Sequence, residues 1–403
     1  MKRNILGKLF GCILSLSIFW LWYNIYHRTI LEIIDTRRAL SAVINKTKSG
    51  VILSTKPSKL KYILQWTKPE NVPFVYMGVG QNTFFENKCK YTNCYVTSNR
   101  YYLEHYTLFD VIIFAGPEVV LMDDYHLPAE RSSTQKYVFA TIESSQFYPV
   151  CSYKFDGYFN WTWSFRLDSE SRWGYIVIRD KKNKIIGPNK VMHWMKLEDM
   201  EPVSEEFKMS LKTKTKAVAW FVSNCFSRSR RELVARRLGN ELAKYSLTVD
   251  VYGQCGFLSC PRDNEQKCED MIKKTYYFYL AFENSFSEDY VTEKILHGLK
   301  NNAIPIVYGA ANYTRFMPEG IYLNAAELSV ETLAMKINEL INNPEKYVEY
   351  FKWTNYYTYH RRNDNSETND YCSMCALLNN EDMLTKKSVK ENFRQWWDSP
   401  AIC

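Results

Sequence analysis

The chain has 403 residues, of which 46% are hydrophobic and 16% aromatic, and its formal net charge is +8. This length suffices for two domains of ordinary size, each with its own packed core. The positive charge is spread out without a run of lysine or arginine, which argues against a nucleic acid partner and suits an anionic small molecule.

Near the N-terminus, residues 9–26 form one apolar run, LFGCILSLSIFWLWYNIY, that is just long enough to span a thin bilayer. Lys2, Arg3 and Lys8 precede the run, so the positive-inside rule predicts a type II orientation with a cytosolic tail over 1–8. A cleaved signal peptide is the competing interpretation, but the run is long for one and no small-x-small site follows it. We therefore expect a signal anchor over 9–26 and a stem over 27–55, with the remainder in a secretory lumen.

Cysteines and glycosylation sequons agree with this compartment. Cys12 lies in the apolar run, which leaves ten of the eleven cysteines for the lumenal part. Cys372-Ser-Met-Cys375 could be half a zinc site, but no second such pair or histidine pair completes it, so disulfides with undetermined partners are preferred. The disulfide candidates are Cys89, Cys94, Cys255, Cys260, Cys268, Cys372 and Cys375. The predicted glycosylation sites are Asn45, Asn160 and Asn312.

The first globular region begins near Leu60 and contains short apolar runs separated by helical or loop segments, the pattern of a parallel α/β sheet. A lysine-rich stretch from Lys181 to Lys216, with Pro188 and Pro202, marks a domain boundary. We therefore expect an N-terminal, acceptor-side α/β domain over 56–205. Its expected strands are 62–66, Phe74–Met77, Val111–Phe114 and Tyr137–Thr141.

The second region repeats this pattern over 206–365. Expected strands are Ala217–Val222, Thr248–Tyr252, Tyr276–Phe282 and Ile304–Tyr308, with helical spacing over 228–245 and 291–300. After Pro344 we expect an aromatic helical segment over Tyr347–Tyr359 and a polar loop over Arg361–Asp370. A cysteine-containing segment over 366–403 follows, with a closing helix at Phe393–Trp397.

The stretch from Tyr277 to Gly309 predicts a βαβ unit whose polar residues lie at one end of the sheet. A helix is expected to open near Thr292, with Glu293 and Lys294 in its first turn. In open α/β sheets, ligands bind outside the carboxyl ends of the strands, where a helix N-terminus attracts an anion. A nucleotide diphosphate fits this position, and a solvated first turn is the alternative interpretation.

These residues resemble the signature of the α1,3/4-fucosyltransferase family at Phe278–Ser285, Asp289–Lys294 and Ile304–Gly309. Two further blocks resemble the same family, and the first of them is most similar to its core-type branch, which modifies the innermost GlcNAc of N-glycans. They are Val222–Arg231 with Val249–Gly256 and Cys260–Arg262, and Thr141–Ser145 with Phe159–Glu170. Looser matches extend the resemblance over about Leu60 to Cys375. The departures from the family pattern are Ala115, Ser145, Phe165, Glu170 and His297-Gly298.

The resemblance implies a GT-B fold, with two Rossmann-like domains facing a cleft, behind a single-pass type II anchor in the Golgi membrane. It implies inverting transfer of L-fucose from GDP-fucose to O3 of a GlcNAc, with the innermost GlcNAc of N-glycans as the expected acceptor. A Lewis-type enzyme acting on lactosamine is the nearest alternative. An inactive lumenal glycan-binding homologue and a soluble cytosolic nucleotide-binding enzyme are the other hypotheses.

The resemblance also implies which residues carry the chemistry. A sugar hydroxyl is a poor nucleophile, so the reaction needs a carboxylate on the acceptor side to take its proton, and Glu143 has the position of the family's general base. Arg231 or Arg230, with Lys294, is expected to stabilise the diphosphate, and Glu293 to bind fucose or the donor ribose. Further candidates for donor contacts are Arg166, Asn284, Tyr290 and Thr292.

No metal is required by this scheme, because arginine and lysine neutralise the phosphates. A divalent cation such as Mn²⁺ is expected at most to stimulate the reaction. Two acidic pairs superficially resemble metal motifs, but we do not expect them to be ligands: Asp123-Asp124 and Asp168 with Glu170.

Overall fold

The computed structural model describes residues 60–70, 74–260, 264–398 and 402–403, all within one compact unit, Lys59–Cys403. The expected tail over 1–8, the anchor over 9–26 and the stem over 27–55, with the sequon at Asn45, lie outside the described residues. Within the described part of the chain, no helix is both long and apolar enough to cross a bilayer. The membrane anchor therefore stays a prediction.

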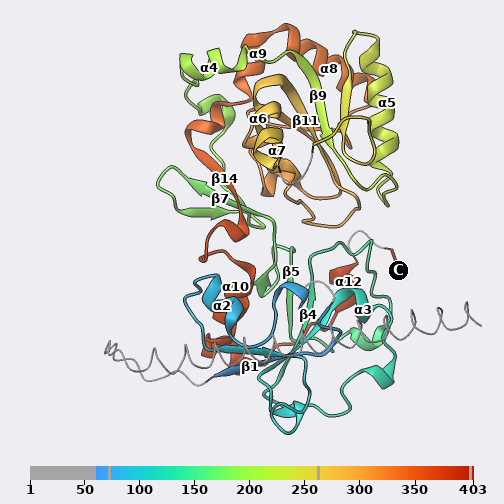
Figure 1. Ribbon diagram of the computed structural model, residues 1–403, viewed down its shortest axis with the longest axis vertical. Helices are drawn as coiled ribbons and strands as arrows, with labels where there is room; N and C mark the ends of the chain where they lie inside the picture. Colours follow the sequence, from blue (N-terminus) through green and yellow to red (C-terminus); the bar gives the residue numbers. More distant parts are fainter. Residues whose placement is uncertain (1–59, 71–73, 261–263, 399–401) are drawn as a thin grey trace, which may run out of the picture. The chain divides into compact units, whose positions relative to one another are not determined.

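The N-terminal part of this unit is built on a parallel sheet of six strands in the order β2-β1-β3-β4-β5-β6 (Figure 1). Every residue of β3, β4 and β5 is buried, as expected for parallel strands that are covered on both faces. The strands are β1 Lys61–Gln65, β2 Cys94–Thr97, β3 Val111–Ala115, β4 Lys136–Thr141, β5 Trp161–Ser164 and β6 Ser171–Arg172.

The expected strand over Phe74–Met77 is wrong, because these residues form the 3-10 helix η1 Phe74–Tyr76. The Met77 amide donates to the Phe74 carbonyl at 2.8 Å, and Gly78 then turns the chain at a φ of +66°. A backbone that bonds to itself within three residues leaves no donors and acceptors for a neighbouring strand. The apolar run of four residues therefore closes into a turn.

Short helices cover the first sheet, and three of them come from the far end of the chain. Figure 1 shows α10, in red, beside α2, in blue. Met374 and Leu378 of α10 pack in one core with Ile63 and Val111, while Trp397 packs with the other face of the sheet. The helices are α2 Asn82–Glu86, η2 Tyr106–Leu108, α3 Gly116–Val119, η3 Asp124–His126, η4 Tyr153–Phe155, α10 Asp370–Leu378, α11 Glu381–Thr385 and α12 Phe393–Trp397.

A second parallel sheet has the order β10-β9-β11-β12-β13. Counted from its own first strand, this is the doubly wound order 2-1-3-4-5, so the chain reverses its direction of winding between β9 and β11. Loops diverge at such a point and leave room for a ligand at the carboxyl ends of the strands. The strands are β9 Lys216–Phe221, β10 Val249–Tyr252, β11 Tyr276–Phe282, β12 Ile304–Tyr308 and β13 Leu323–Asn324.

Helices cover both faces of this second sheet and form a separate core on each. One core contains Leu238 of α5 and Leu333 of α8, and the other contains Ile272 of α6 and Ile295 of α7. The helices predicted over 228–245 and 291–300 are confirmed with shorter bounds. The helices are α4 Glu205–Leu211, α5 Arg231–Ala243, α6 Glu265–Thr275, α7 Lys294–Leu299, η7 Tyr313–Arg315, α8 Val330–Asn342 and α9 Pro344–Glu349.

A small antiparallel sheet, β14-β7-β8, is formed by β7 Ile176–Asp180, β8 Ile185–Gly187 and β14 Tyr357–Arg361. The helix expected over Tyr347–Tyr359 is therefore wrong in its second half, where the 3-10 helix η8 Lys352–Asn355 leads into β14. Tyr357 and Tyr359 are buried and alternate with half-buried Thr358, the period of a strand. The remaining 3-10 helices are η5 Leu197–Asp199 and η9 Arg362–Asp364.

All ten cysteines outside the apolar run form disulfides, which confirms the disulfide prediction and gives the pairing. Cys372 and Cys375 bond to Cys89 and Cys94, not to each other, so two bridges tie α10 to the first sheet. Cys151, Cys225 and Cys403 are bonded as well. The pairs are Cys89–Cys372, Cys94–Cys375, Cys151–Cys403, Cys225–Cys255 and Cys260–Cys268.

The two bridges to α10 should stabilise the protein non-additively. They join the same two segments, across sequence separations of 283 and 281 residues, so either bridge alone closes the long loop. Replacing one pair by alanine should lower the free energy of unfolding by about 1–2 kcal/mol, and replacing both pairs by about 5 kcal/mol. Denaturant unfolding of the two double variants and the quadruple variant measures these losses. If the quadruple variant lost only the sum of the two double-variant losses, the prediction would be wrong.

Candidate functional site

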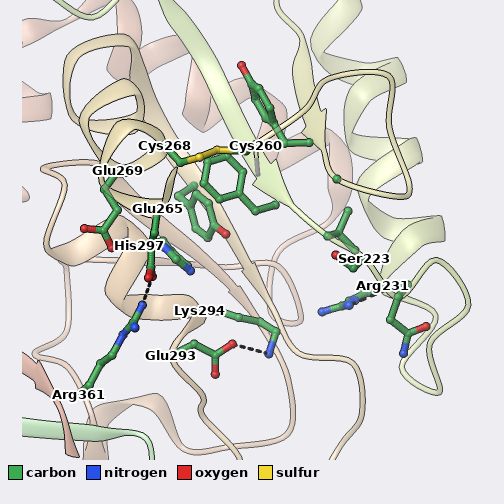
Figure 2. Close-up of a pocket in the computed structure, with 16 residues that line it drawn as sticks. Ser223, Arg231, Cys260, Glu265, Cys268, Glu269, Glu293, Lys294, His297 and Arg361 are labelled. Atoms are coloured by element: carbon green, nitrogen blue, oxygen red, sulfur yellow. Dashed lines mark hydrogen bonds and ion pairs between the residues drawn. A yellow bond between two sulfur atoms is a disulfide. The ribbon is translucent and has the colours of Figure 1, made fainter. Parts of the chain in front are cut away.

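A cavity of about 480 Å³ opens at the carboxyl ends of β9 and β10, beside α6 and α7 (Figure 2). It lies where the strand order reverses, the position expected for a ligand in a doubly wound sheet. Gly253, which follows β10, has a φ of +98°, and a Cβ there would lie 2.6 Å from the Val222 carbonyl oxygen. Glycine is therefore needed to bring the loops after β9 and β10 so close together.

In the described part of the chain, Arg231 at the start of α5 and Lys294 at the start of α7 are two of the three cations that line this cavity, and Arg361 is the third (Figure 2). Arg231 is 4% exposed and donates from Nη1 to the Phe282 carbonyl at 2.6 Å. Its buried Nε has no hydrogen-bond partner among the described residues. Arg230 is instead exposed, with a φ of +53° just before the helix, and does not line the cavity. Of the two predicted arginines, only Arg231 is placed to meet a ligand there.

Lys294 is held by a buried carboxylate that the sequence analysis did not assign. Its Nζ lies 3.0 Å from Glu283 Oε2 and 2.6 Å from Thr292 Oγ1, and Glu283 also accepts from the Thr292 amide at 2.8 Å. Burial acts to lower the pKa of Lys294, but Glu283 and Glu293 outweigh it and raise the pKa above its ordinary value. Lys294 is therefore a fixed positive charge at neutral pH, with Thr292 as a supporting residue.

Glu143 follows β4 of the first sheet and contacts the loop between β11 and α7. Its Oε2 accepts a hydrogen bond of 2.8 Å from the hydroxyl of Tyr290, whose side chain is buried. Burial raises the pKa of Glu143, and the Tyr290 hydrogen bond and the charge of Lys294 partly offset the rise. Tyr290 has a pKa well above its usual value, chiefly through burial, so its hydroxyl stays a donor.

Serine pairs fix the loop of Glu143 against the loop after β11. Ser144 Oγ donates to Ser285 Oγ at 2.6 Å, and Ser145 Oγ lies 3.0 Å from Ser287 Oγ. Ser145 stands where the resembled family usually has proline, and here its hydroxyl makes one of these contacts. The hydrogen bonds determine where the Glu143 carboxylate lies relative to Lys294.

The predicted donor residues Asn284 and Arg166 lie outside the cavity. Asn284 accepts from the Ser229 amide at 3.0 Å and from Ser285 Oγ at 3.1 Å. Arg166 donates to the Trp396 carbonyl at 2.7 Å and to Glu288 at 3.0 Å, within a cluster of three basic and three acidic side chains. Both residues therefore have structural partners. The cluster is Arg166, Lys190, Arg315, Asp168, Glu288 and Asp289.

Aromatic side chains also line the cavity, and the sequence did not indicate Phe221, Tyr279 or His297 as binding residues. The ring of Phe221 lies 5.6 Å from that of Tyr279 and 5.9 Å from that of His297. Burial lowers the pKa of His297, so the ring is neutral at pH 7. Arg361 forms an ion pair with Glu265 at the rim, as Figure 2 shows. Flat rings beside polar groups of both signs suit a heterocyclic base.

The departure His297-Gly298 does not prevent α7 from forming. A Cβ at Gly298 would lie 3.1 Å from the Ala303 carbonyl oxygen and 3.2 Å from the Pro305 Cβ. The absence of a side chain at Gly298 thus permits close packing of α7 against the start of β12, which offsets its low helix propensity.

The two sequons in the described part of the chain differ in whether the asparagine side chain is free to carry a glycan. Asn160 Nδ2, the atom that would carry a glycan, donates to the Ser388 carbonyl at 2.6 Å, and its Oδ1 accepts from the Tyr137 amide. Glycosylation at Asn160 is thus incompatible with this packing. Asn312 is exposed and uses Oδ1 to cap η7, so it stays a predicted acceptor.

Within the described ranges, no group of three or more histidine, cysteine, aspartate or glutamate side chains could hold a metal ion. Asp123 instead pairs with His126, and Glu170 with Lys390. Stimulation by a divalent cation stays a prediction.

Comparisons with known proteins match the chain to two family models. The model described as "Glycosyltransferase family 10 (fucosyltransferase) C-term" matches residues 211–396, and "Fucosyltransferase, N-terminal" matches residues 58–176.

Three curated relatives illustrate the range of similarity. Alpha-(1,3)-fucosyltransferase C of Drosophila melanogaster is 34% identical over 77% of this chain and 71% of its own length. Glycoprotein 3-alpha-L-fucosyltransferase A of the same organism is 32% identical over 80% of this chain and 58% of its own length. 4-Galactosyl-N-acetylglucosaminide 3-alpha-L-fucosyltransferase FUT6 of Pongo pygmaeus is 29% identical over 83% of both.

Proposed function

Because the chain belongs to glycosyltransferase family 10, the fucosyltransferases, we propose that it transfers L-fucose from GDP-fucose to O3 of a GlcNAc with inversion. One observation carries the proposal: a cavity lined by two fixed cations, Arg231 and Lys294, lies near the half-buried carboxylate of Glu143, which follows β4 of the first sheet. We further propose that the two sheets are the Rossmann-like halves of a GT-B enzyme, with the donor bound at the second.

In this proposal the diphosphate of GDP-fucose binds between Arg231 and Lys294. The Nε of Arg231, which has no hydrogen-bond partner within the described part of the chain, can donate to a phosphate oxygen, and the charge of Lys294 is fixed by Glu283. The guanine fits beside Phe221, Tyr279 and His297. Glu293, at the start of α7, contacts fucose or ribose through its partly exposed carboxylate.

The reaction needs one base and one stabilised leaving group. O3 of the acceptor attacks C1 of fucose while the bond from C1 to the β-phosphate oxygen breaks, and the electron pair of that bond leaves with GDP. The hydroxyl proton passes to Glu143, which returns it to solvent. Arg231 and Lys294 stabilise the negative charge that develops on the departing phosphate.

The innermost GlcNAc of N-glycans is the acceptor we propose. The relative named as a glycoprotein 3-alpha-L-fucosyltransferase supports this choice. The relative named for 4-galactosyl-N-acetylglucosaminide supports lactosamine as the second candidate. We also propose that residues 9–26 anchor the enzyme in the Golgi membrane with type II topology, which recovery of the full chain in salt-washed microsomes would test.

The secreted ectodomain, from about Lys56 onward, tests the proposed function. It is offered GDP-fucose with either a GlcNAc-terminated N-glycopeptide or a lactosamine oligosaccharide, and product mass and linkage are determined. Transfer to O3 of the innermost GlcNAc supports the core-type function, and transfer only to lactosamine supports the Lewis-type one. Folded protein that binds GDP but transfers to neither would favour the inactive glycan-binding hypothesis.

Tyr290→Phe should move the acid limb of the kcat–pH profile to higher pH. The Tyr290 hydroxyl lowers the pKa of Glu143 by stabilising its carboxylate, so removing the hydroxyl raises that pKa. Glu143 acts as a base only when ionised, and activity is therefore lost at a higher pH as the solution is acidified. A matched control is Tyr347→Phe, which removes another buried hydroxyl, bonded to the Tyr277 carbonyl at 2.7 Å, away from the site. An unmoved acid limb in Tyr290→Phe would contradict the pairing.

A further inference from the structure

A second cavity, of about 600 Å³, adjoins the first and shares Glu293 and Arg361 with it. Ile142, which immediately precedes Glu143, lies in its wall. The cavity is built from distant parts of the chain, namely η1, the end of β4, the turn after β6, Glu293 and the segment from the end of β14 to the start of α10. A molecule bound here would lie beside the residue that precedes Glu143.

The cavity wall contains a buried oxygen atom to which no described residue donates a hydrogen bond. Asp370 is 1% exposed, and its Oδ1 accepts from Arg362 Nε at 3.0 Å. Its Oδ2 is buried and has no hydrogen-bond partner among the described residues. Burial raises the pKa of Asp370 to about 6, and Arg362 offsets part of the rise. A ligand hydroxyl that donated to Oδ2 would satisfy this oxygen.

Aromatic rings form the apolar part of the wall. Tyr76 is 67% exposed, whereas Trp173 and Tyr371 are buried, with ring centroids 5.6 Å apart. Exposed aromatic rings bind the C–H faces of sugars, and rings combined with a few placed polar groups are typical of a specific ligand site.

Carboxylates outnumber guanidinium groups at the rim, which disfavours an anionic ligand and suits a neutral one. Arg361 is paired with Glu265, and Arg362 with Asp370. Asp364 and Glu293 add two carboxylates. An anionic ligand would meet these carboxylates and find both guanidinium groups engaged.

Disulfides and hydrogen bonds hold the frame of the cavity together. The Cys89–Cys372 and Cys94–Cys375 bridges hold α10, and the Arg362 amide donates to the Tyr175 carbonyl at 3.3 Å. The Tyr175 hydroxyl in turn donates to the Ile142 carbonyl at 2.5 Å. A preorganised site loses less entropy when it binds a ligand.

We propose that this second cavity is the acceptor subsite, where Tyr76 and Asp370 bind the sugar linked to the reacting GlcNAc while O3 of that GlcNAc lies at Glu143. The proposal rests on the proposed function and adds the residues that recognise the neutral, hydroxyl-rich acceptor. It places part of acceptor recognition in the C-terminal segment, Arg361–Tyr371, as well as in the first sheet.

Binding without turnover tests the subsite separately from catalysis. The Glu143→Gln ectodomain, saturated with GDP, is titrated calorimetrically with the N-glycopeptide and with the lactosamine oligosaccharide. Adding Tyr76→Ala should raise the Kd of the preferred glycan about tenfold, the effect of losing one aromatic contact, and leave the GDP affinity unchanged. A matched control is Tyr125→Ala, because Tyr125 is 96% exposed on η3 and lines neither cavity.

A second variant tests the polar contact. Asp370→Asn replaces one carboxylate oxygen by an amide donor, and it should also raise the glycan Kd while a thermal melt shows an intact fold. Unchanged glycan affinity in Tyr76→Ala, or an equal change in Tyr125→Ala, would overturn the subsite, as would no glycan binding in the Glu143→Gln protein. If glycan binding depends on Tyr76 but wild-type protein transfers no fucose, the subsite stands and the proposed function fails.

Discussion

Glu143→Gln should lower kcat by about 10³-fold, within the 10²–10⁴ range of general-base catalysis, and leave the melting temperature and GDP affinity close to wild type. The amide keeps the shape of the side chain but cannot take the proton of the acceptor hydroxyl. The structure gives Glu143 one side-chain hydrogen bond, from Tyr290, which glutamine can also accept through its carbonyl oxygen. The loss should therefore appear in the chemical step and not in folding.

Steady-state kinetics at saturating donor and acceptor, beside thermal melts, measures this effect. Glu86→Gln is a matched control, because Glu86 is exposed at the end of α2 and lines neither cavity. A Glu143→Gln enzyme that kept more than a tenth of wild-type kcat would require another base.

Lys294→Met should lower kcat/KM by about 10²–10³-fold, the usual effect of removing one group that stabilises developing charge. Lys294 is the only lysine that lines the first cavity among the described residues, and its positive charge is fixed by Glu283. The substitution also leaves Glu283, which is 0% exposed, without its neutralising partner, so it should lower the melting temperature.

A double variant separates these two effects. Glu283→Gln with Lys294→Met removes both charges and should recover most of the lost stability without recovering kcat/KM. Lys300→Met, at the exposed C-terminal end of the same helix, is the control for loss of a lysine. Recovery of kcat/KM in the double variant would mean that Lys294 acts only by stabilising the fold.

Local patterns predict much of the second sheet and part of its site. The apolar runs at Tyr276–Phe282 and Ile304–Tyr308 are buried strands because neighbours cover both of their faces. Lys294 and Arg231 lie at helix N-termini beside the reversal point, where the βαβ pattern and the resemblance expect a diphosphate. These features depend on residues that are close in the sequence, so a short stretch of sequence is enough to predict them.

Long-range contacts account for what the sequence did not predict. The hydrogen bond from Tyr290 to Glu143 joins residues 147 positions apart, and the partner of Cys372 lies 283 residues away. No periodicity reveals such pairs. The start of β14 was expected to be helical because the spacing of its aromatic residues fits a helix as well as a strand. Only the pairing with β7 distinguishes the two. The second cavity likewise combines five segments, so its residues gather only in the folded chain.

The configuration of the new glycosidic bond, determined by NMR on a product made from GDP-β-L-fucose and the N-glycopeptide, tests the central claim most directly. Direct attack by an acceptor O3 that is deprotonated by Glu143 predicts one α-L-fucosyl linkage at O3 and one GDP released per transfer. A β-L-linkage, or an α-linkage formed at an undiminished rate by Glu143→Gln, would contradict the account.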